Sequence, residues 1–329
     1  MSYPPGIEPW EHVDMMYISI ESTIALASVM GNMLVVLVVG VNRNLRDPTF
    51  CFIVSLALAD IAVGALVIPL AVVVSLGLKT HFYTCLFFSC LLLIITQSSI
   101  LSLLAIALDR YLRVKIPTRY NIIVTQRRAW GAVCVCWLLS ALTGVVPMFG
   151  WHNQATDGNL TTALITCKFT SVMSMGYMVY FNFFGWVVVP LTIMIGLYAA
   201  IFHIIRRQLN RRAEATANAD KYYRKELKLA QSLALVVFLF VLCWLPLHIM
   251  NCVLYFCPQY HVPKSAMYTG IFMSHVNSAL NPMVYAFRIQ RFRATLIQIA
   301  RRCMLCKAAE ASPCQASPPP ICEKTPVDL

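Results

Sequence analysis

Seven long apolar stretches dominate this sequence, and each has at least the roughly 20 residues that a helix needs to cross a lipid bilayer. They run Ile18–Gly40, Phe50–Val74, Leu86–Ala107, Trp130–Phe149, Tyr177–Ile201, Leu229–Phe256 and Tyr268–Phe287. Apolar residues make up 59% of the 329 residues and charged residues only 12%, which excludes an ordinary soluble domain. We therefore expect an all-α membrane protein with a seven-helix transmembrane bundle.

The distribution of charge predicts how this bundle lies in the membrane. The segment before the first span carries Glu8, Glu11 and no Lys or Arg, so we expect an extracellular N-terminus. Of the 26 Lys and Arg residues, all but Lys79, Lys168 and Lys264 fall in segments that are then cytoplasmic. The net charge of +12 thus indicates an inner face that meets lipid and protein, and no nucleic-acid partner is expected.

The chain divides into four parts with one membrane domain. We expect an extracellular N-terminus at 1–16, the seven-helix domain at 17–287, a short amphipathic eighth helix at 288–302 and a disordered cytoplasmic tail at 303–329. The protein is expected in the cell membrane as a multi-pass protein. Asn159 heads the one glycosylation sequon, in an expected outer loop, although such tripeptides also occur by chance.

Polar residues inside the spans are costly and are therefore candidate functional residues. Asp60 lies in the middle of the second span, and other spans carry polar residues at a similar depth. These are Asn32, Ser99, Asn277, Ser278 and Asn281. One carboxylate with hydroxyl and amide oxygens suits a sodium ion, so Asp60, Ser99 and the three polar residues of the seventh span are a candidate sodium site. A polar network between helices without an ion is the alternative.

A second polar group lies nearer the outer ends of the spans. Glu21 and His275 either form a charge-assisted hydrogen bond with each other across two helices, or each is satisfied separately by other groups. Aromatic and polar side chains repeat at helical spacing in the sixth and seventh spans, which is typical of a core or of a binding pocket. The polar heads of Asn182, His248 and Asn251 favour a pocket for a small, flat, polar-edged ligand.

Other classes of function fit this sequence less well. A membrane transporter or channel for a small purine-like solute is the alternative, but such proteins often have internal repeats and broken helices, which we do not see. An enzyme is not expected, because the sequence has no phosphate-binding glycine loop, H-E-x-x-H or nucleophile elbow.

Three short motifs in the right helices resemble the rhodopsin-like G-protein-coupled receptors. They are Asp109-Arg110-Tyr111, Cys243-Trp244-Leu245-Pro246 and Asn281-Pro282-Met283-Val284-Tyr285. Longer stretches, such as Tyr177–Phe184 and Trp244–His248, are similar to the adenosine receptors, and Ser171-Val172-Met173 most resembles their third subtype. The resemblance extends from Asn32 to Phe292.

The resemblance implies adenosine as ligand and a set of binding residues. Asn251 would bind the adenine amine and a ring nitrogen, Phe169 would stack on the purine, and Thr96, Ser274 and His275 would hold the ribose. The remaining site residues implied by the family or by the helical pattern are Leu92, Leu93, Met178, Asn182, Trp244, Leu247, His248, Ile271 and Glu21. Leu92 stands where receptors for cationic amines carry an anion, which favours a neutral ligand. Thr170 replaces the glutamate of the first two subtypes, and His248 replaces the serine of mammalian third-subtype receptors.

The resemblance also implies a disulfide between Cys85 and Cys167 and a switch for a heterotrimeric G protein, of the inhibitory class that lowers cyclic AMP. Arg110 would pair with Asp109 and Glu226 at rest, and Tyr198 and Tyr285 would turn toward it on activation. Tyr111 completes the motif. Cys303 and Cys306 are candidate palmitoylation sites, with free thiols as the alternative. No cofactor is expected apart from the candidate sodium ion.

Overall fold

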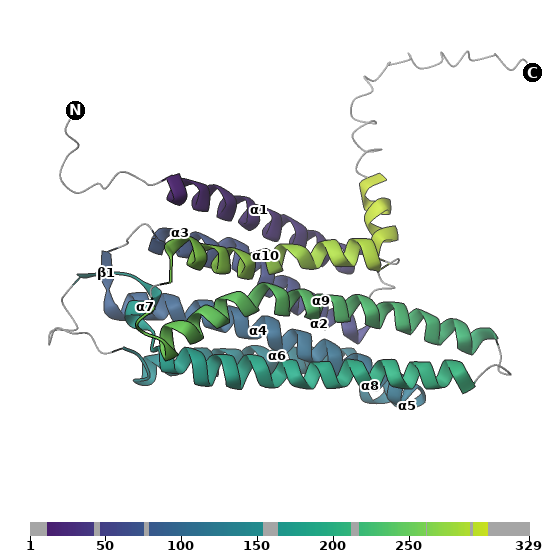
Figure 1. The fold of residues 1–329 in the computed structure, drawn as a ribbon. Coiled ribbons are helices and arrows are strands. Elements are labelled where there is room, and N and C mark those ends of the chain that lie inside the picture. Colours follow the sequence, from purple (N-terminus) through teal and green to yellow (C-terminus); the bar gives the residue numbers. More distant parts are fainter. Residues whose placement is uncertain are drawn as a thin grey trace, which may run out of the picture.

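The computed structural model describes residues 12–42, 47–75, 79–153, 164–211, 217–260, 262–289 and 292–301. Seven spans lie side by side in one bundle (Figure 1). They are α1 (His12–Val41); α2 (Pro48–Ala62) with the π-helix η2 (Val63–Val67) and α3 (Ile68–Ser75); α4 (Phe82–Lys115); α6 (Gln126–Gly144) with the 3₁₀-helix η3 (Val146–Phe149); the π-helix η4 (Tyr177–Val188) with α8 (Val189–Arg211); α9 (Ala217–Phe256); and α10 (Lys264–Arg288). The predicted seven-helix fold is confirmed.

Short elements occupy both ends of the bundle. At one end β1 (Lys79–His81) pairs antiparallel with β2 (Leu164–Thr166), next to the one-turn helix α7 (Phe169–Val172). We call this the disulfide end, after the Cys85–Cys167 bond. The opposite end holds α5 (Pro117–Ile123) and Arg110, and we call it the arginine end. Here residues 292–301 form a helix that turns sharply away from α10 (Figure 1), where the amphipathic eighth helix was expected.

Most of the long helices are apolar enough to cross a membrane. Within the described residues, five helices meet this requirement alone, and a sixth does so if α5 and α6 are counted together across their 71° bend. The last span, α10, is more polar because Ser274, His275, Asn277, Ser278 and Asn281 all lie on it. These polar residues are buried, so the bundle and not the lipid surrounds them.

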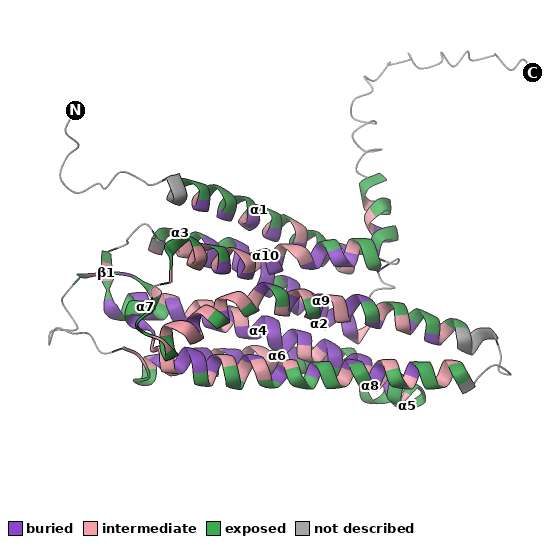
Figure 2. Cartoon of the chain, in the orientation of Figure 1, coloured by how far each residue is buried: buried purple, intermediate pink, exposed green. Residues whose placement is uncertain are grey.

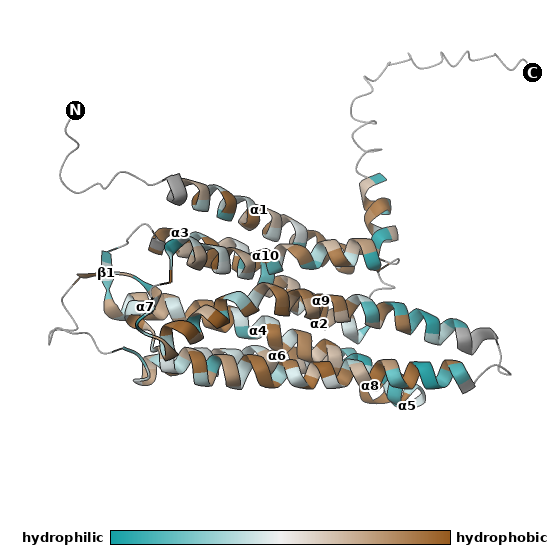
Figure 3. Ribbon diagram, in the orientation of Figure 1, coloured by the Kyte–Doolittle hydropathy of each residue, from teal (hydrophilic) through white to brown (hydrophobic). Residues whose placement is uncertain are grey.

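The surface of the bundle suits a lipid environment. Large apolar side chains such as Leu26, Leu138, Ile195 and Phe238 are more than half exposed, on four different helices. Figure 2 shows the outer side of α1 and α8 mainly exposed while α4 is largely buried, and Figure 3 shows the hydrophilic residues of α8 and α9 gathered at the arginine end. An apolar outside with polar ends is expected of helices that cross a bilayer.

Buried polar contacts fix how the helices pack. Trp137 on α6 donates its indole N–H to Ser55 on α2 (3.1 Å), and the Ser55 and Ser102 hydroxyls are 3.0 Å apart. Asn32 on α1 donates to the carbonyl oxygen of Ser278 on α10 (2.9 Å). Each of these bonds joins two spans through groups that lipid cannot satisfy.

The helices extend beyond the apolar stretches that predicted them. α8 continues to Arg211 and α9 begins at Ala217, so most of the expected basic inner loop is helical. Polar and basic residues continue these two helices past the apolar core, where no hydropathy signal marks an end. Asn159, Cys303 and Cys306 lie outside the described residues.

Candidate functional site

A cavity of about 260 Å³ opens between the helices toward the disulfide end. The predicted residues that line it are Leu92, Leu93, Thr96, Phe169, Met178, Asn182, Trp244, Leu247, His248, Asn251, Ile271, Ser274 and His275. Residues of α1, η2 and α3 that were not predicted, among them Tyr17, Val67 and Ala71, widen it on one side. The structure thus brings together side chains from α4, α7, η4, α9 and α10.

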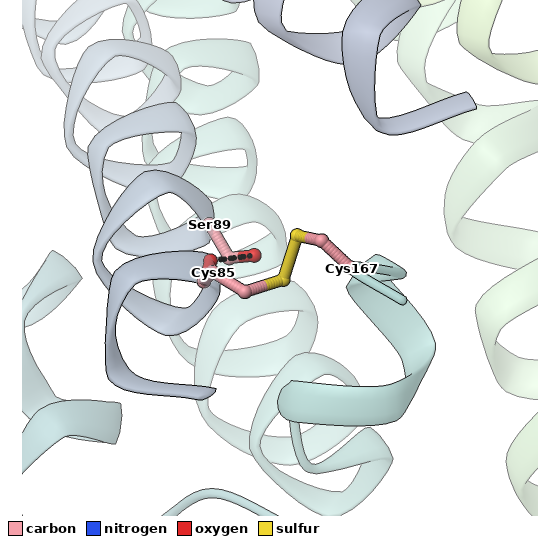
Figure 4. The surroundings of a disulfide bond; sticks show 3 residues. All are labelled: Cys85, Ser89 and Cys167. Atoms are coloured by element: carbon pink, nitrogen blue, oxygen red, sulfur yellow. Dashed lines mark hydrogen bonds between the residues drawn. A yellow bond between two sulfur atoms is a disulfide. The ribbon is translucent and has the colours of Figure 1, made fainter. Parts of the chain in front are cut away.

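The Cys85–Cys167 disulfide positions the segment that covers this cavity. It joins the first turn of α4 to the short segment between β2 and α7, with Cα atoms 5.6 Å apart (Figure 4). The bond was implied by the family resemblance and is confirmed. Phe169 follows Cys167 by two residues and lines the cavity, while Asn153 donates to the carbonyl oxygen of Thr170 (3.0 Å). A covalent bond, a two-stranded sheet and this hydrogen bond therefore hold Phe169 over the opening.

The α9 wall offers polar groups that other described residues leave unpaired. Asn251 is only 7% exposed, and it lines the cavity. His248 is buried with neither ring nitrogen bonded, and its ring stacks on Phe183 at 4.7 Å between centroids. The indole N–H of Trp244 is also buried without a partner. Because such groups cost free energy unless they are paired, they favour a polar ligand in the cavity.

Gln97 is a buried residue next to the cavity that sequence reasoning missed. Its amide N–H donates to Asn182 Oδ1 (3.1 Å), and its carbonyl oxygen accepts from the hydroxyl of Thr143. Tyr177 donates to the backbone carbonyl of Thr143 (2.8 Å), which extends the network to η4. Gln97 thereby fixes the amide of Asn182 at the cavity wall. The same argument that singled out Asn32, a polar side chain within a span, would have found it.

Glu21 and His275 are brought together at the α1–α10 interface. His275 Nδ1 lies 2.8 Å from Glu21 Oε2, and the Glu21 residue is completely buried. Glu21 does not line the cavity itself; it holds the His275 ring, which does. Ser274 and Thr96 donate their hydroxyl protons to carbonyl oxygens of their own helices, Ile271 (2.6 Å) and Leu92 (2.9 Å). Their lone pairs remain available as acceptors for ligand hydroxyls.

A cluster of buried oxygens surrounds Asp60 below the cavity. Asn281 Nδ2 donates to Asp60 Oδ2 (2.7 Å), and Ser28 donates to the Asp60 backbone carbonyl (2.9 Å). Within the part of the chain that the structure describes, Asp60 Oδ1, Asn277 Oδ1 and Asn281 Oδ1 are buried without a hydrogen-bond partner. Ser99 is buried on α4, and its hydroxyl donates to the Ile95 carbonyl (3.3 Å). The orphaned acceptors are of the type that a hard cation prefers.

The arginine end is organised around Arg110, which is 1% exposed. Its guanidinium lies 2.8 Å from Asp109 Oδ2 and 3.3 Å from Glu226 Oε2 on α9. Thr49 on α2, which sequence reasoning missed, bonds to both Asp109 and Arg110. This network ties α2 and α9 to the end of α4.

The three tyrosines predicted for the switch are not among the hydrogen-bond partners of Arg110, which in the described part of the chain are Asp109, Glu226 and Thr49. Tyr198 on α8 and Tyr285 on α10 are buried, and neither hydroxyl has a hydrogen-bond partner. Tyr111 packs against the apolar core. Both buried hydroxyls could form further hydrogen bonds, because a buried hydroxyl without a partner is costly.

Residues 31–285 match the family of the 7 transmembrane receptors (rhodopsin family). The match covers more than half of the chain, which therefore belongs to the rhodopsin family of seven-transmembrane receptors.

Curated relatives narrow this class further. The chain is 51% identical over 295 residues to Adenosine receptor A3 of Ovis aries, covering 90% of this chain and 92% of that protein. It is 50% identical to Adenosine receptor A3 of Bos taurus over 295 residues, with the same coverage. It is also 50% identical to that of Canis lupus familiaris over 296 residues, covering 90% and 94%. The resemblance to the third adenosine receptor subtype is confirmed, and these relatives are receptors and not enzymes.

Proposed function

We propose that this chain is a receptor for extracellular adenosine that signals through a heterotrimeric G protein. The observation that carries the proposal is Asn251, a 7% exposed amide on the wall of a cavity that is lined largely by apolar side chains. An Asn side chain matches the amine donor and adjacent ring acceptor of adenine in a bidentate manner. The relatives with about half of their residues identical are named as adenosine receptors.

The remaining site residues suit the rest of a nucleoside. Phe169, held above the cavity by the disulfide, would stack on the purine, and Leu247 and Ile271 would form apolar walls. The ribose would extend toward Thr96, Ser274 and His275, where acceptors and an imidazole line the cavity. No carboxylate of the described residues lines the cavity, since Glu21 contacts His275 and does not line it, so a neutral ligand fits this site.

Signalling would follow from a shift between two states of the arginine end. The Arg110–Glu226 contact fastens α9 to α4 and represents the resting state. Adenosine would favour a state in which α9 swings outward about Pro246, which lies within the helix, and Tyr198 and Tyr285 then contact Arg110. A ligand shifts this equilibrium only by the difference in its affinity for the two states. The partner proposed for the opened cleft is a G protein of the inhibitory class.

The proposed orientation places the disulfide end outside the cell and the arginine end inside. The basic residues expected on the inner side, including Arg113, Arg206 and Arg207, lie at the arginine end, where they would meet anionic lipid headgroups.

We further propose a sodium ion at the Asp60 cluster. Asp60 Oδ1, Asn277 Oδ1 and Asn281 Oδ1 are its candidate ligands because they are buried acceptors without partners, with Ser99 and Ser278 as hydroxyl ligands. When bound, sodium would neutralise the buried carboxylate. Asp60 and Asn281 are already held 2.7 Å apart, which orients the carboxylate toward α10.

The Asn251→Ala variant tests the proposal directly. Loss of a bidentate contact is expected to weaken adenosine binding by about 10- to 100-fold, since such a pair is worth about 1–3 kcal/mol. Thr170→Ala is the matched control, because Thr170 lies at the exposed rim of the same cavity. Competition binding on membranes should show near-wild-type affinity in the control. Near-wild-type adenosine affinity in Asn251→Ala would count against the site.

A further inference from the structure

Two arginines share one glutamate at the arginine end. Arg110 Nη1 lies 3.3 Å from Glu226 Oε2, and Arg113 Nε lies 3.9 Å from Glu226 Oε1. The two arginines are three residues apart on α4 and therefore project from the same side of the helix. The carboxylate of Glu226 thus faces a cation at each of its oxygens.

Arg113 is also held by groups that do not belong to α9. Its Nη2 lies 3.2 Å from Oδ2 of Asp47, the residue that precedes α2. The carbon at the centre of its guanidinium lies 4.9 Å from the ring centroid of Tyr120 on α5, within the range of a cation–π interaction. Its side chain is 18% exposed, so solvent only partly screens these contacts.

The contacts of Arg113 close a ring. Tyr120 donates its hydroxyl proton to Asp109 Oδ1 (2.6 Å), and Asp109 Oδ2 accepts from Arg110 Nη2 (2.8 Å). The ring therefore runs Asp109, Arg110, Glu226, Arg113, Tyr120 and back to Asp109. We call these five residues the arginine ring. Glu226 is its one member from α9; the other four come from α4 and α5.

We propose that Arg113 is a positioning residue of the switch, which keeps the Glu226 carboxylate on Arg110 and remains in place when α9 moves. This inference rests on the proposed function, because it concerns the same movement of α9. Outward movement removes only Glu226 from the arginine ring. Asp47 and Tyr120 then keep the Arg113 guanidinium near its resting position, ready to bind Glu226 again.

The geometry predicts that replacing Arg113 raises ligand-independent activation only modestly and that the rise depends on Glu226. A partly exposed ion pair at 3.9 Å is weaker than the buried pair that Arg110 makes. We expect Arg113→Gln to raise ligand-independent G-protein activation about two- to fivefold. Arg113→Lys should bring ligand-independent activation only part of the way back to the wild-type level, because an ammonium group lacks the planar guanidinium that contacts Glu226, Asp47 and the Tyr120 ring together.

A double-mutant cycle tests this role. Wild type, Arg113→Gln, Glu226→Gln and the double variant are purified in phospholipid nanodiscs, and basal nucleotide exchange on an added G-protein heterotrimer is measured. Arg119→Gln is the matched control, an exposed arginine of α5 outside the arginine ring. Hydrogen exchange of the α9 amides around Glu226 reports release of the helix without any G protein.

Arg113 acts through Glu226 if the double variant is no more active than Glu226→Gln alone, and Asp47→Asn should then show a smaller rise than Arg113→Gln. The proposal is overturned if the two single effects multiply in the double variant, or if Arg113→Gln leaves both basal exchange and α9 hydrogen exchange at wild-type values. A wild type that never responds to adenosine would contradict the proposed function, while hydrogen exchange at α9 would still test the arginine ring.

Discussion

Removing His275 should destabilise the protein strongly, because its partner cannot be satisfied in any other way within the described residues. Glu21 is completely buried, and its Oε2 accepts the 2.8 Å bond from His275, while Oε1 has no partner. His275→Ala leaves this carboxylate unpaired. Leaving a buried hydrogen-bonding group without its partner costs about 1–3 kcal/mol, and more when the group is charged.

A second substitution separates two contributions to the loss of stability, the unpaired carboxyl group of Glu21 and the packing lost with the His275 ring. Glu21→Gln removes the charge and keeps the shape, so Glu21→Gln/His275→Ala should be more stable than His275→Ala alone. The assay is thermal unfolding of the purified receptor, followed by the exposure of buried cysteines to a thiol-reactive dye. We expect His275→Ala to lower Tm by about 5–10 °C and the double variant to regain part of that loss. Equal Tm values for the two variants would refute the pairing as the source of stability.

Three further predictions concern other contacts in the bundle. Gln97→Leu should lower the free energy of unfolding by about 1–3 kcal/mol and weaken adenosine binding, because it leaves the buried Oδ1 of Asn182 without its donor. Thermal unfolding measures the first effect and competition binding the second. Cys85→Ser should destabilise the protein by about 2–4 kcal/mol and weaken ligand binding through Phe169, an effect that reduction of the wild type should reproduce. Sodium should change adenosine affinity in the wild type but not in Asp60→Asn, and a sodium titration with potassium as the control measures this difference.

Much of the architecture could be predicted because the bilayer imposes simple rules on sequence. The seven apolar stretches were sufficient to predict the bundle, and the positions of Lys and Arg were the basis for its predicted orientation. Asp60 and Asn281 were linked as candidates because buried charge is rare in spans and because polar residues four apart share a face. The pairing of Glu21 with His275 was one of two alternatives, and the structure places them in contact.

Other features depend on contacts that no local pattern records. The π-helix η4 lies inside one of the predicted spans, and the hydropathy pattern of that span does not mark a change of helical register. The bonds from Thr49 to Asp109 and from Tyr120 to Asp109 join segments 60 and 11 residues apart in the chain. Arg113 was counted only as a basic inner residue, because its role depends on how α5 and α9 pack against α4.

The most direct measurement of the central claim is adenosine-stimulated nucleotide exchange by the purified chain. The receptor in phospholipid nanodiscs is mixed with a G-protein heterotrimer of the inhibitory class, and GTP binding is followed as adenosine is added. We predict that adenosine accelerates exchange in the wild type and that Asn251→Ala needs about 10- to 100-fold more adenosine for the same rate. A folded wild type whose exchange rate is the same with and without saturating adenosine, for this and every other G-protein class, would contradict it.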